Sequence, residues 1–394
     1  MNSPVVDIDA LVAQRRTRLL TIMEERGISA ILTADPFSIR YATGTRNMLV
    51  HGLTGPDRLT LVTHDGRATV WEFAGCEHLW ADHPGIDDIR PAPALNAKKS
   101  PDYLNEAARF ALEVRDLVRQ QGTNEVAVES IDPPAAAALE NAGLSLLDAN
   151  AVFQHAMAIK QPAEIQAMRA AVCITEAATS DLERAIVPGR TEQEVWAEFH
   201  RSLIAMGGEL VVTRLLQSGH RTFPYFQEAS DHVLDPRALV CFDTDAVALH
   251  GYSVDFSRTF LCGEFPASAI QRKLYGIAHS QLLENACNLE PGRSFREFAD
   301  RAFNVPEPYR QYGYYQLAHG LGLAGGQPNI PRRGPEPYPL PGVFEPGMVI
   351  CVESYVGDPE SRQGIKLEDQ YLITSNGAEA MTTYAFDNHL LGSA

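Results

Sequence analysis

The chain has 394 residues, 45% of them hydrophobic and 21% charged, and this length and composition predict a globular protein of two domains. Its formal net charge of -17 argues against nucleic acids and anionic membranes as partners, because both bind clustered Lys and Arg side chains. No segment has the length and apolar character of a signal peptide or a membrane span, so we expect a cytoplasmic protein.

Residues 8–152 alternate helix-like stretches with short β-rich runs, which is typical of an α/β domain. The helical pattern covers LVAQRRTRLLTIMEERG, and the strand patterns are SAILTA, RLTLVTH, RATVWEF and NEVAVES. A long amphipathic helix then begins in IKQPAEIQAMR, with Pro162 in its first turn. We therefore predict one domain over residues 1–155 and a second over residues 156–394.

The second domain contains an internal repeat, which begins with two similar helix starts. PGRTEQEVWAEF matches PGRSFREFADRAF, and each predicts a helix that opens with a capping box. The paired capping residues are Thr191 with Glu194 and Ser294 with Glu297.

Two further pairs of segments in this repeat end in a carboxylate. DPRALVCFD, ending at Asp243, matches EPGMVICVE, ending at Glu353, and both predict a buried strand that an acid closes. GYSVD, ending at Asp255, matches GIKLE, ending at Glu368. If the two halves pack about a pseudo-twofold axis, the four acids meet at one centre, where their repulsion requires a cation. The repeat therefore predicts a metal site.

Four carboxylates with one imidazole suit divalent Mn, Fe, Co or Zn, and this many carboxylates usually hold two ions. We choose His319, in LAHGLGLAGG, as the imidazole because the glycines after it let the backbone approach the acids. Without the acids, a core histidine would be the better interpretation of His319. Asp243 and Asp245 are two residues apart and share a face of an ideal strand, so either or both can reach the metal.

Two other patterns predict no cofactor or metal. GLGLAG fits the dinucleotide fingerprint, but no helix is expected after it, so we discount a nucleotide. The cysteines are far apart, never form a Cys-x-x-Cys pair and in several cases lie in apolar runs, so we expect buried thiols in a reducing compartment. They are Cys76, Cys173, Cys241, Cys262, Cys287 and Cys351.

These motifs resemble the pita-bread metalloenzyme family, which includes methionine aminopeptidase, prolidase, aminopeptidase P and creatinase, over nearly the whole chain. The resemblance lies in IKQPAEIQAMR, ALVCFDTDAVALHGYSVDFSRTF, AHGLGL, EPGMVICVES and GIKLEDQYLIT. It implies an α/β (α+β) fold, with a creatinase-like N-terminal domain before a pseudo-twofold pita-bread catalytic domain, and a homodimer that acts on a small molecule. It also implies two bound metals and a proton-transfer role for Glu353. The implied metal ligands are Asp243 and/or Asp245, followed by Asp255, His319, Glu353 and Glu368.

The chain departs from the peptidases of this family at two places. They carry a histidine where Tyr225 stands and another shortly after the metal histidine, where this chain has Gly325, Gly326 and Gln327. Those histidines position and protonate the peptide group, so ordinary Xaa-Pro cleavage is not the first expectation.

Within the family, the chain resembles the dimethylsulfoniopropionate lyase branch most, through IRYATGTRNM, TRLLQSG, RTFPYFQE, CFDTD and TTYAFD. That branch also has three aspartates like those at 243, 245 and 255 and a tyrosine like Tyr314. Its catalytic base, however, is an aspartate six residues after the metal histidine, and this chain has Gly325 there. Glycine cannot abstract a proton, so the resemblance implies a sister activity.

We therefore expect a metal-dependent hydrolase for an amide or other C–N bond of a small zwitterionic molecule, with Glu353, His319 and Tyr314 as catalytic residues. The alternatives are a β-elimination lyase in which Tyr314 or a metal-bound hydroxide replaces the missing base, an Xaa-Pro aminopeptidase or dipeptidase, and a non-catalytic metal-binding scaffold. Tyr225, Phe226 and Tyr314 are candidate substrate contacts, because aromatic faces attract quaternary cations. Their alternative role is that of half-buried core aromatics.

Overall fold

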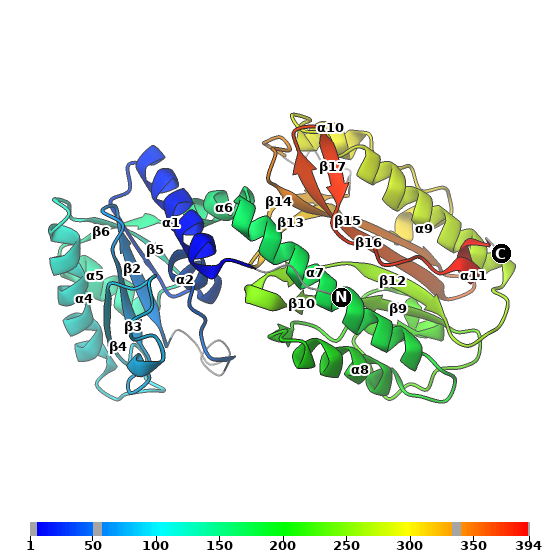
Figure 1. Ribbon diagram of the computed structural model, residues 1–394, viewed down its shortest axis with the longest axis horizontal. Coiled ribbons are helices and arrows are strands. Elements are labelled where there is room, and N and C mark those ends of the chain that lie inside the picture. The colour runs from blue at the N-terminus through cyan, green and yellow to red at the C-terminus, as the bar shows by residue number, and fades with distance from the viewer. Residues whose placement is uncertain (1–5, 50–56, 333–339, 393–394) are drawn as a thin grey trace. The chain divides into compact units, whose positions relative to one another are not determined.

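The computed structural model describes residues 6–49, 57–332 and 340–392 (Figure 1). The described chain forms two compact units, which divide between Met157 and Ala158, and each unit has a hydrophobic core of its own. The division lies two residues from the domain boundary that the sequence predicts. None of the helices in the described ranges has the length and apolar character needed to cross a membrane. The cytoplasmic location and the homodimer remain predictions.

The N-terminal unit is a mixed six-stranded sheet with helices, as the alternating sequence pattern predicts. The strand order is β4-β3-β2-β1-β5-β6, in which β1 pairs antiparallel with β2 and parallel with β5. Asp7 and Asp35 cap the first two helices by accepting hydrogen bonds from first-turn amides. The elements are α1 (Ile8–Glu25), β1 (Ala30–Thr33), α2 (Pro36–Thr43), β2 (Leu59–Thr63), β3 (Ala68–Glu72), β4 (Asp88–Pro91), α4 (Tyr103–Arg119), β5 (Glu125–Glu129), α5 (Pro133–Asn141), β6 (Ser145–Asp148) and α6 (Asn150–Ala158).

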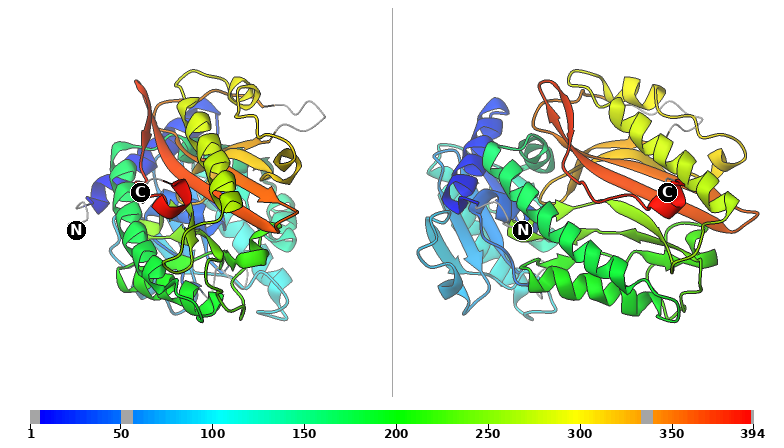
Figure 2. Two further views of the ribbon diagram at one scale, coloured as in Figure 1. Left: turned by 90° about the vertical axis from the view of Figure 1, so that its right-hand side faces the viewer. Right: turned by 45° about the vertical axis from the view of Figure 1, so that its right-hand side comes forward.

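The helices of the second unit begin where the sequence predicts. Pro162 is in the first turn of α7, and both predicted capping boxes form, at Thr191 with Glu194 and at Ser294 with Glu297. Helix α9 packs against β15 and β16, and α8 packs against α7 and β8 (Figure 2). The helices are α7 (Pro162–Ala185), α8 (Glu192–Ala205), α9 (Ala269–Cys287), α10 (Phe295–Asp300) and α11 (Asn388–Leu391).

The second unit is built on a large sheet with the strand order β14-β13-β15-β16-β12-β9-β8, to which β17 adds beside β16. A small sheet has the strand order β11-β10-β7. In the sequence, β10 follows β9 and β11 precedes β12. The strands are β7 (Leu210–Val211), β8 (Leu216–Ser218), β9 (Leu239–Asp243), β10 (Ala246–Val247), β11 (Ser253–Val254), β12 (Ser257–Leu261), β13 (Gln316–Leu321), β14 (Gly325–Pro331), β15 (Val349–Asp358), β16 (Gln363–Thr374) and β17 (Gly377–Ala380).

Two sequence predictions about this unit are wrong in part. Asp243 ends β9 as predicted, but Glu353 lies in the middle of β15, because β15 and β16 form one long hairpin that pairs through Asp358. The cysteines are all free, and Cys241, Cys262 and Cys351 are buried. Cys287, however, is exposed because it ends α9, and Cys76, outside the regular elements, and Cys173, within α7, are half-buried.

Candidate active site

Three acids lie in one row across four antiparallel strands of the large sheet. Asp243 of β9 is opposite Ser257 of β12, Ser257 is also opposite Glu368 of β16, and Glu368 is opposite Glu353 of β15. Side chains that are directly opposite in a sheet point to the same face. The register therefore brings Asp243 beside two carboxylates that are more than a hundred residues further along the sequence.

His319 belongs to the neighbouring row of the same face. It is opposite Cys351 of β15, which lies two residues before Glu353 and so faces the same side. The Nδ1 atom of His319 lies 3.2 Å from the carbonyl oxygen of Gly320, which leaves Nε2 to face the acids. The glycine after the histidine thus contributes its carbonyl, a role that the sequence pattern did not reveal.

The donor atoms around His319 have the spacing of metal ligands. Its Nε2 lies 3.6 Å from Asp255 Oδ2, 3.6 Å from Glu353 Oε1 and 3.5 Å from Glu368 Oε1. Neighbouring ligand atoms of a tetrahedral ion with bonds of about 2.1 Å are about 3.4 Å apart. The distance from His319 to each of the three acids is therefore the distance between two ligands of one divalent cation.

Three buried oxygen atoms of the acids have no hydrogen-bond partner within the described part of the chain, namely Asp243 Oδ1, Glu353 Oε2 and Glu368 Oε1. The last two have ion-pair contacts, with Lys366 and His319 respectively. An ionised oxygen that is buried without a partner is costly, and a bound cation removes that cost. Oxygen-rich ligands with one imidazole suit Mn, Fe, Co or Zn, so the chemistry of the residues also fits a metal.

Lys366 is the central residue that the sequence analysis missed. Its ammonium lies 2.8 Å from both Glu353 Oε2 and Glu368 Oε2 and 3.1 Å from Asp243 Oδ2. Burial alone would lower the pKa of Lys366, but these three acids raise it well above its ordinary value, so the ammonium keeps its proton. The lysine stands two residues before Glu368 in GIKLE, and the two-residue period of a strand was the signal that could have placed it there.

The charges in this cluster do not balance. With all five carboxylates ionised and His319 neutral, which is the state that metal binding requires, the ammonium of Lys366 leaves four negative charges, and two divalent ions would neutralise that number. Burial, Glu368 and Asp245 raise the pKa of Asp255 well above its ordinary value. Burial alone would also raise the pKa of Glu368, but Lys366 and His319 lower it to about 2. We call Asp243, Asp245, Asp255, His319, Glu353 and Glu368 the carboxylate centre.

Asp243 and Asp245 have different surroundings, so the picture of two acids on one ideal strand is wrong. Strand β9 ends at Asp243, and Asp245 has a left-handed backbone with a φ of 37°. Asp243 Oδ2 accepts a hydrogen bond of 2.8 Å from the hydroxyl of Tyr225, whereas Asp245 Oδ2 accepts one from the hydroxyl of Thr213. Burial and the charge of Asp243 raise the pKa of Asp245 to about 6.

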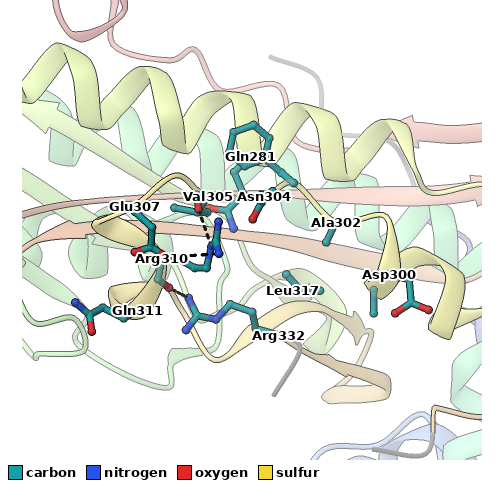
Figure 3. Close-up of a pocket in the computed structure, with 12 residues that line it drawn as sticks. Gln281, Asp300, Ala302, Asn304, Val305, Glu307, Arg310, Gln311, Leu317 and Arg332 are labelled. Carbon is teal, nitrogen blue, oxygen red and sulfur yellow. Dashed lines mark hydrogen bonds and ion pairs between the residues drawn. The ribbon is translucent and has the colours of Figure 1, made fainter. Parts of the chain in front are cut away.

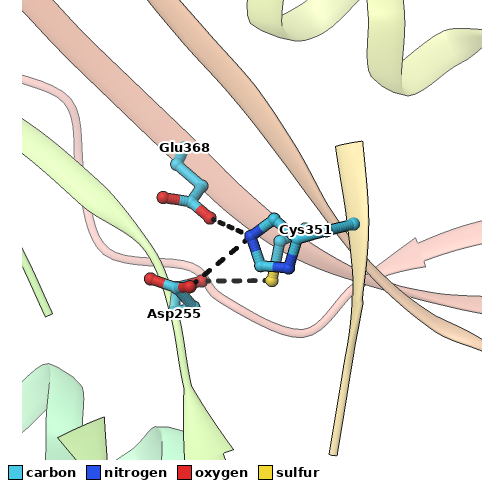
Figure 4. Close-up of side chains that lie close together, drawn as sticks. Asp255, Cys351 and Glu368 are labelled. Atoms are coloured by element: carbon cyan, nitrogen blue, oxygen red, sulfur yellow. Dashed lines mark hydrogen bonds and ion pairs between the residues drawn. The ribbon is translucent and has the colours of Figure 1, made fainter. Parts of the chain in front are cut away.

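Cys351 belongs to the group of ligand atoms around His319, in addition to being the buried thiol that the sequence predicts. Its Sγ and one donor atom each of Asp255, His319 and Glu368 all lie within 4.8 Å of one another (Figure 4). The thiol lies 3.7 Å from the backbone carbonyl oxygen of Asp255, to which it donates a hydrogen bond. Burial and Asp255 raise its pKa well above the ordinary value, so the thiol keeps its proton.

An aromatic pocket of about 490 Å³ adjoins the carboxylate centre. Tyr225 links the two, because its hydroxyl contacts Asp243 while its ring lines the pocket. The Nζ atom of Lys366 lies 5.6 Å from the ring centroid of Tyr225 and 5.3 Å from that of Tyr314. The described residues that line the pocket are Phe223, Pro224, Tyr225, Phe226, Gln311, Tyr312, Gly313, Tyr314, Tyr315 and Tyr355. The structure thus brings Tyr225, Phe226 and Tyr314 together around one pocket.

Gly325 begins β14 and is opposite Leu321, so the GLGLAG segment is part of a β-hairpin rather than a strand-to-helix turn. A Cβ atom built on Gly325 would meet no atom within 4 Å. The position therefore has room for a larger side chain, and steric crowding does not explain the glycine.

A second pocket, of about 520 Å³, has none of the predicted site residues in its described lining (Figure 3). Arg310 and Arg332 line it together with Gln281 and Glu307, and Arg332 donates a hydrogen bond of 2.5 Å to the carbonyl oxygen of Arg310. Gln311 lines both this pocket and the aromatic pocket. The segment that carries Arg310 and Gln311 thus separates the two pockets.

Comparisons with known proteins place the chain among metalloenzymes. The model of metallopeptidase family M24 matches residues 166–375, and the creatinase/prolidase N-terminal domain matches residues 15–130. Dimethylsulfoniopropionate lyase DddP from Roseovarius nubinhibens is 34% identical over 98% of this chain and 89% of its own length. Xaa-Pro dipeptidase from Pyrococcus furiosus is 30% identical over 57% of this chain and 63% of its own length.

A solved structure confirms the predicted fold class. The Xaa-Pro dipeptidase from Bacillus anthracis superimposes with a TM-score of 0.78 at 22% identity and covers 95% of this chain and 98% of its own. The chain therefore has a creatinase-like N-terminal domain and a pita-bread catalytic domain, in the order that the sequence predicts.

Proposed function

We propose that the chain, which belongs to the metallopeptidase family M24, is a metal-dependent hydrolase of an amide or other C–N bond in a small zwitterionic substrate. One observation carries this proposal. The ligand atoms of Asp255, His319, Glu353 and Glu368 converge at metal-ligand spacing beside a pocket whose described lining includes no charged side chain.

The carboxylate centre would hold two divalent ions. The supporting argument is the four negative charges that the ionised acids carry beyond Lys366, together with the buried Asp243 Oδ1, which accepts no hydrogen bond in the described part of the chain. Divalent ions in such a site polarise a carbonyl oxygen and lower the pKa of water. Lys366 would hold the Oε2 atoms of Glu353 and Glu368 by ion pairs. The Oε1 atom of each acid then faces His319.

Glu353 is the proposed proton carrier. In hydrolysis a water O–H bond and the substrate C–N bond break, a C–O and an N–H bond form, and the proton moves from the water to the leaving nitrogen. Glu353 is buried between His319 and Lys366, whose contacts fix both of its oxygens. The hydroxyl of Tyr314 is the second candidate, as a donor to the substrate, because burial and Glu353 raise its pKa and keep it protonated.

The aromatic pocket would bind the cationic end of the substrate. Seven of its ten described lining residues are aromatic, and Tyr225 and Tyr314 lie with their ring centroids 5.6 Å apart. A quaternary cation binds to aromatic faces by cation–π attraction and needs no carboxylate partner. Tyr225, Phe226 and Tyr314 are therefore the proposed substrate contacts.

A β-elimination lyase is the second candidate function. The 34% identity to the lyase DddP, over 98% of this chain, favours it. In that reaction a base removes a proton from the carbon next to the carboxylate, and the C–S bond breaks as a C=C bond forms. Gly325, where the resemblance implies an aspartate base, supplies no such group.

A panel of small betaines, amides, Xaa-Pro dipeptides and dimethylsulfoniopropionate, assayed together with metal analysis, tests the proposal. We expect metal-dependent release of an amine from a betaine-like amide. Release of acrylate and dimethyl sulfide would establish the lyase instead, and cleavage of Xaa-Pro dipeptides alone would establish a peptidase. Full activity in metal-free protein would contradict all three.

The variant Gly325→Asp separates the hydrolase from the lyase further. Because the position has room for a side chain, we expect the variant to fold and to gain release of dimethyl sulfide from dimethylsulfoniopropionate. The matched control is Gly276→Asp, at another glycine whose Cβ would meet no atom within 4 Å. If the wild-type chain releases dimethyl sulfide as fast as Gly325→Asp, position 325 is not where the base is missing.

A further inference from the structure

A buried carboxylate outside the carboxylate centre holds both ends of the segment that lines the aromatic pocket. Glu192 is 0% exposed at the start of α8. Its Oε1 accepts hydrogen bonds of 2.7 and 2.9 Å from the backbone amide and the hydroxyl of Ser218. Its Oε2 accepts bonds of 3.0 and 2.8 Å from the same two groups of Ser230.

The segment between these two serines, residues 219–229, is what we call the pocket loop. It carries Phe223, Tyr225 and Phe226, which line the aromatic pocket. Glu192 also contacts the loop itself, because the Nε atom of Arg221 lies 3.1 Å from Oε2 and 3.2 Å from Oε1. The Nη2 atom of Arg221 in turn donates a hydrogen bond of 2.9 Å to the carbonyl oxygen of Glu228. One carboxylate thus ties together the start, the first turn and the end of the loop.

These contacts require both oxygens of Glu192 to be acceptors. Each oxygen receives one backbone N–H and one hydroxyl, and the two share the Arg221 guanidinium. A glutamine has one acceptor oxygen and would place its NH₂ group against the amide of Ser218 or Ser230. The neutral side chain would also weaken the contact with Arg221. A hydrogen bond between two ionised groups is stronger than one in which the acceptor is neutral.

The internal repeat shows that this carboxylate is not needed to start the helix. In the second copy Phe295 takes the place of Glu192, directly after the cap residue Ser294. The backbone contacts are alike, because the amide of Glu192 donates to His232 O and the amide of Phe295 donates to Gly342 O. Phe295 is buried against Phe344, with ring centroids 5.0 Å apart. Only the half that supplies the segment from Phe223 to Phe226 has a carboxylate at this position.

We propose that Glu192 is a positioning residue that fixes the pocket loop and thereby the placement of Tyr225 and Phe226 for substrate binding. The proposal rests on the proposed function in one respect, namely that the aromatic pocket binds the cationic end of the substrate. Glu192 acts through the loop and contacts neither the substrate nor the metal ligands.

The test compares Glu192→Gln with the wild type in the full, metal-loaded chain. We expect faster amide hydrogen exchange in residues 219–229 and a Kd for tetramethylammonium, used as the cation probe, that rises about tenfold. KM for the substrate found with the panel should rise by a similar factor while kcat stays within about twofold, because the loop binds substrate rather than moving protons. Glu192→Asp keeps two acceptor oxygens and should recover part of the loss.

The matched control is Glu198→Gln, which changes the same group on the surface of the same helix, where Glu198 pairs with Arg190 and Arg201. It should leave loop exchange and cation binding unchanged. Wild-type exchange in residues 219–229 of Glu192→Gln would overturn the proposal. If that variant does not fold, Ser230→Ala, which removes one hydroxyl donor, must show a smaller change in the same residues. If Glu192→Gln speeds exchange in the pocket loop but the wild type does not bind tetramethylammonium, Glu192 fixes the loop and the aromatic pocket does not bind cations.

Discussion

Lys366 supplies the one ammonium that contacts the carboxylate centre in the described part of the chain. Its Nζ contacts Asp243, Glu353 and Glu368, and all three acids are buried. Without bound cations, this ammonium is a counter-charge for all three acids. With bound cations, the acids have other partners. The contribution of Lys366 to stability should therefore depend on metal.

The variant Lys366→Met should lower the free energy of unfolding by about 3 kcal/mol in metal-free protein and by much less in metal-loaded protein, because it leaves buried charges unpaired. Denaturant unfolding with and without a chelator measures the difference. Lys273→Met, which removes an exposed lysine of the same unit, is the control. Equal losses in the two states would show that Lys366 does not act as a counter-charge.

Tyr225 should strengthen metal binding from outside the ligand set. Its hydroxyl donates a hydrogen bond of 2.8 Å to Asp243 Oδ2. Removing a group that hydrogen-bonds to a metal ligand usually weakens metal binding by about 10-fold to 100-fold. We expect Tyr225→Phe to raise the Kd for the metal at least about tenfold, measured by competition with a chromophoric chelator. Tyr315→Phe, at a tyrosine that is 64% exposed, should not change it. An unchanged Kd for Tyr225→Phe would exclude Asp243 as a ligand that depends on this bond.

At the scale of elements, the sequence predicted the helices and strands that have local signals. The capping boxes of α7, α8 and α10 each use two residues that are three apart in the sequence, so they can be recognised locally. Strand β9 is a short apolar run with a turn before it. The length of β15 has no such signal, because its pairing with β16 sets it, and Glu353 was therefore placed at a strand end. The contacts of Glu192 depend on a loop conformation that no sequence spacing reveals.

The residue before the N-cap of α7 is a buried lysine, Lys160, whose charge should make stability depend on pH. Lys160 is 6% exposed, and burial lowers its pKa from 10.5 to about 8, although Glu164 opposes the shift. Between these two values the unfolded chain binds the proton and the folded chain does not. The free energy of unfolding therefore rises with pH in this window, by up to about 3 kcal/mol for this group.

The variant Lys160→Met lacks this titration. We expect it to be more stable than the wild type at pH 7, with the difference closing as the pH rises from 8 to 10.5. Urea unfolding at a series of pH values measures both proteins. A difference that stays constant across the window would mean that Lys160 keeps its ordinary pKa in the folded state.

At the scale of the whole molecule, the two units have separate cores, and every residue of the carboxylate centre belongs to the unit that begins at Ala158. A ligand stabilises only the part of a protein that must be folded to bind it. Metal should therefore stabilise one unit and leave the other unchanged.

Calorimetry should show this as two transitions, of which a chelator lowers one. At a free metal concentration of a hundred times Kd, the stabilisation amounts to about 2.7 kcal/mol. The isolated segment 7–157 provides the comparison, because its transition should coincide with the one that the chelator leaves in place. Equal shifts of both transitions would show that the units unfold together.

The two rows of ligands across the large sheet also bear on how the chain matures. A strand that pairs one residue out of register keeps its backbone hydrogen bonds but turns Phe242, Val352 or Leu367 toward the place of a ligand. Such a chain would have nearly the native content of helix and strand, yet it could not assemble the donor atoms. Metal uptake therefore separates correctly paired chains from mispaired ones after synthesis or refolding, and bound metal per chain is a stricter measure of a native preparation than circular dichroism.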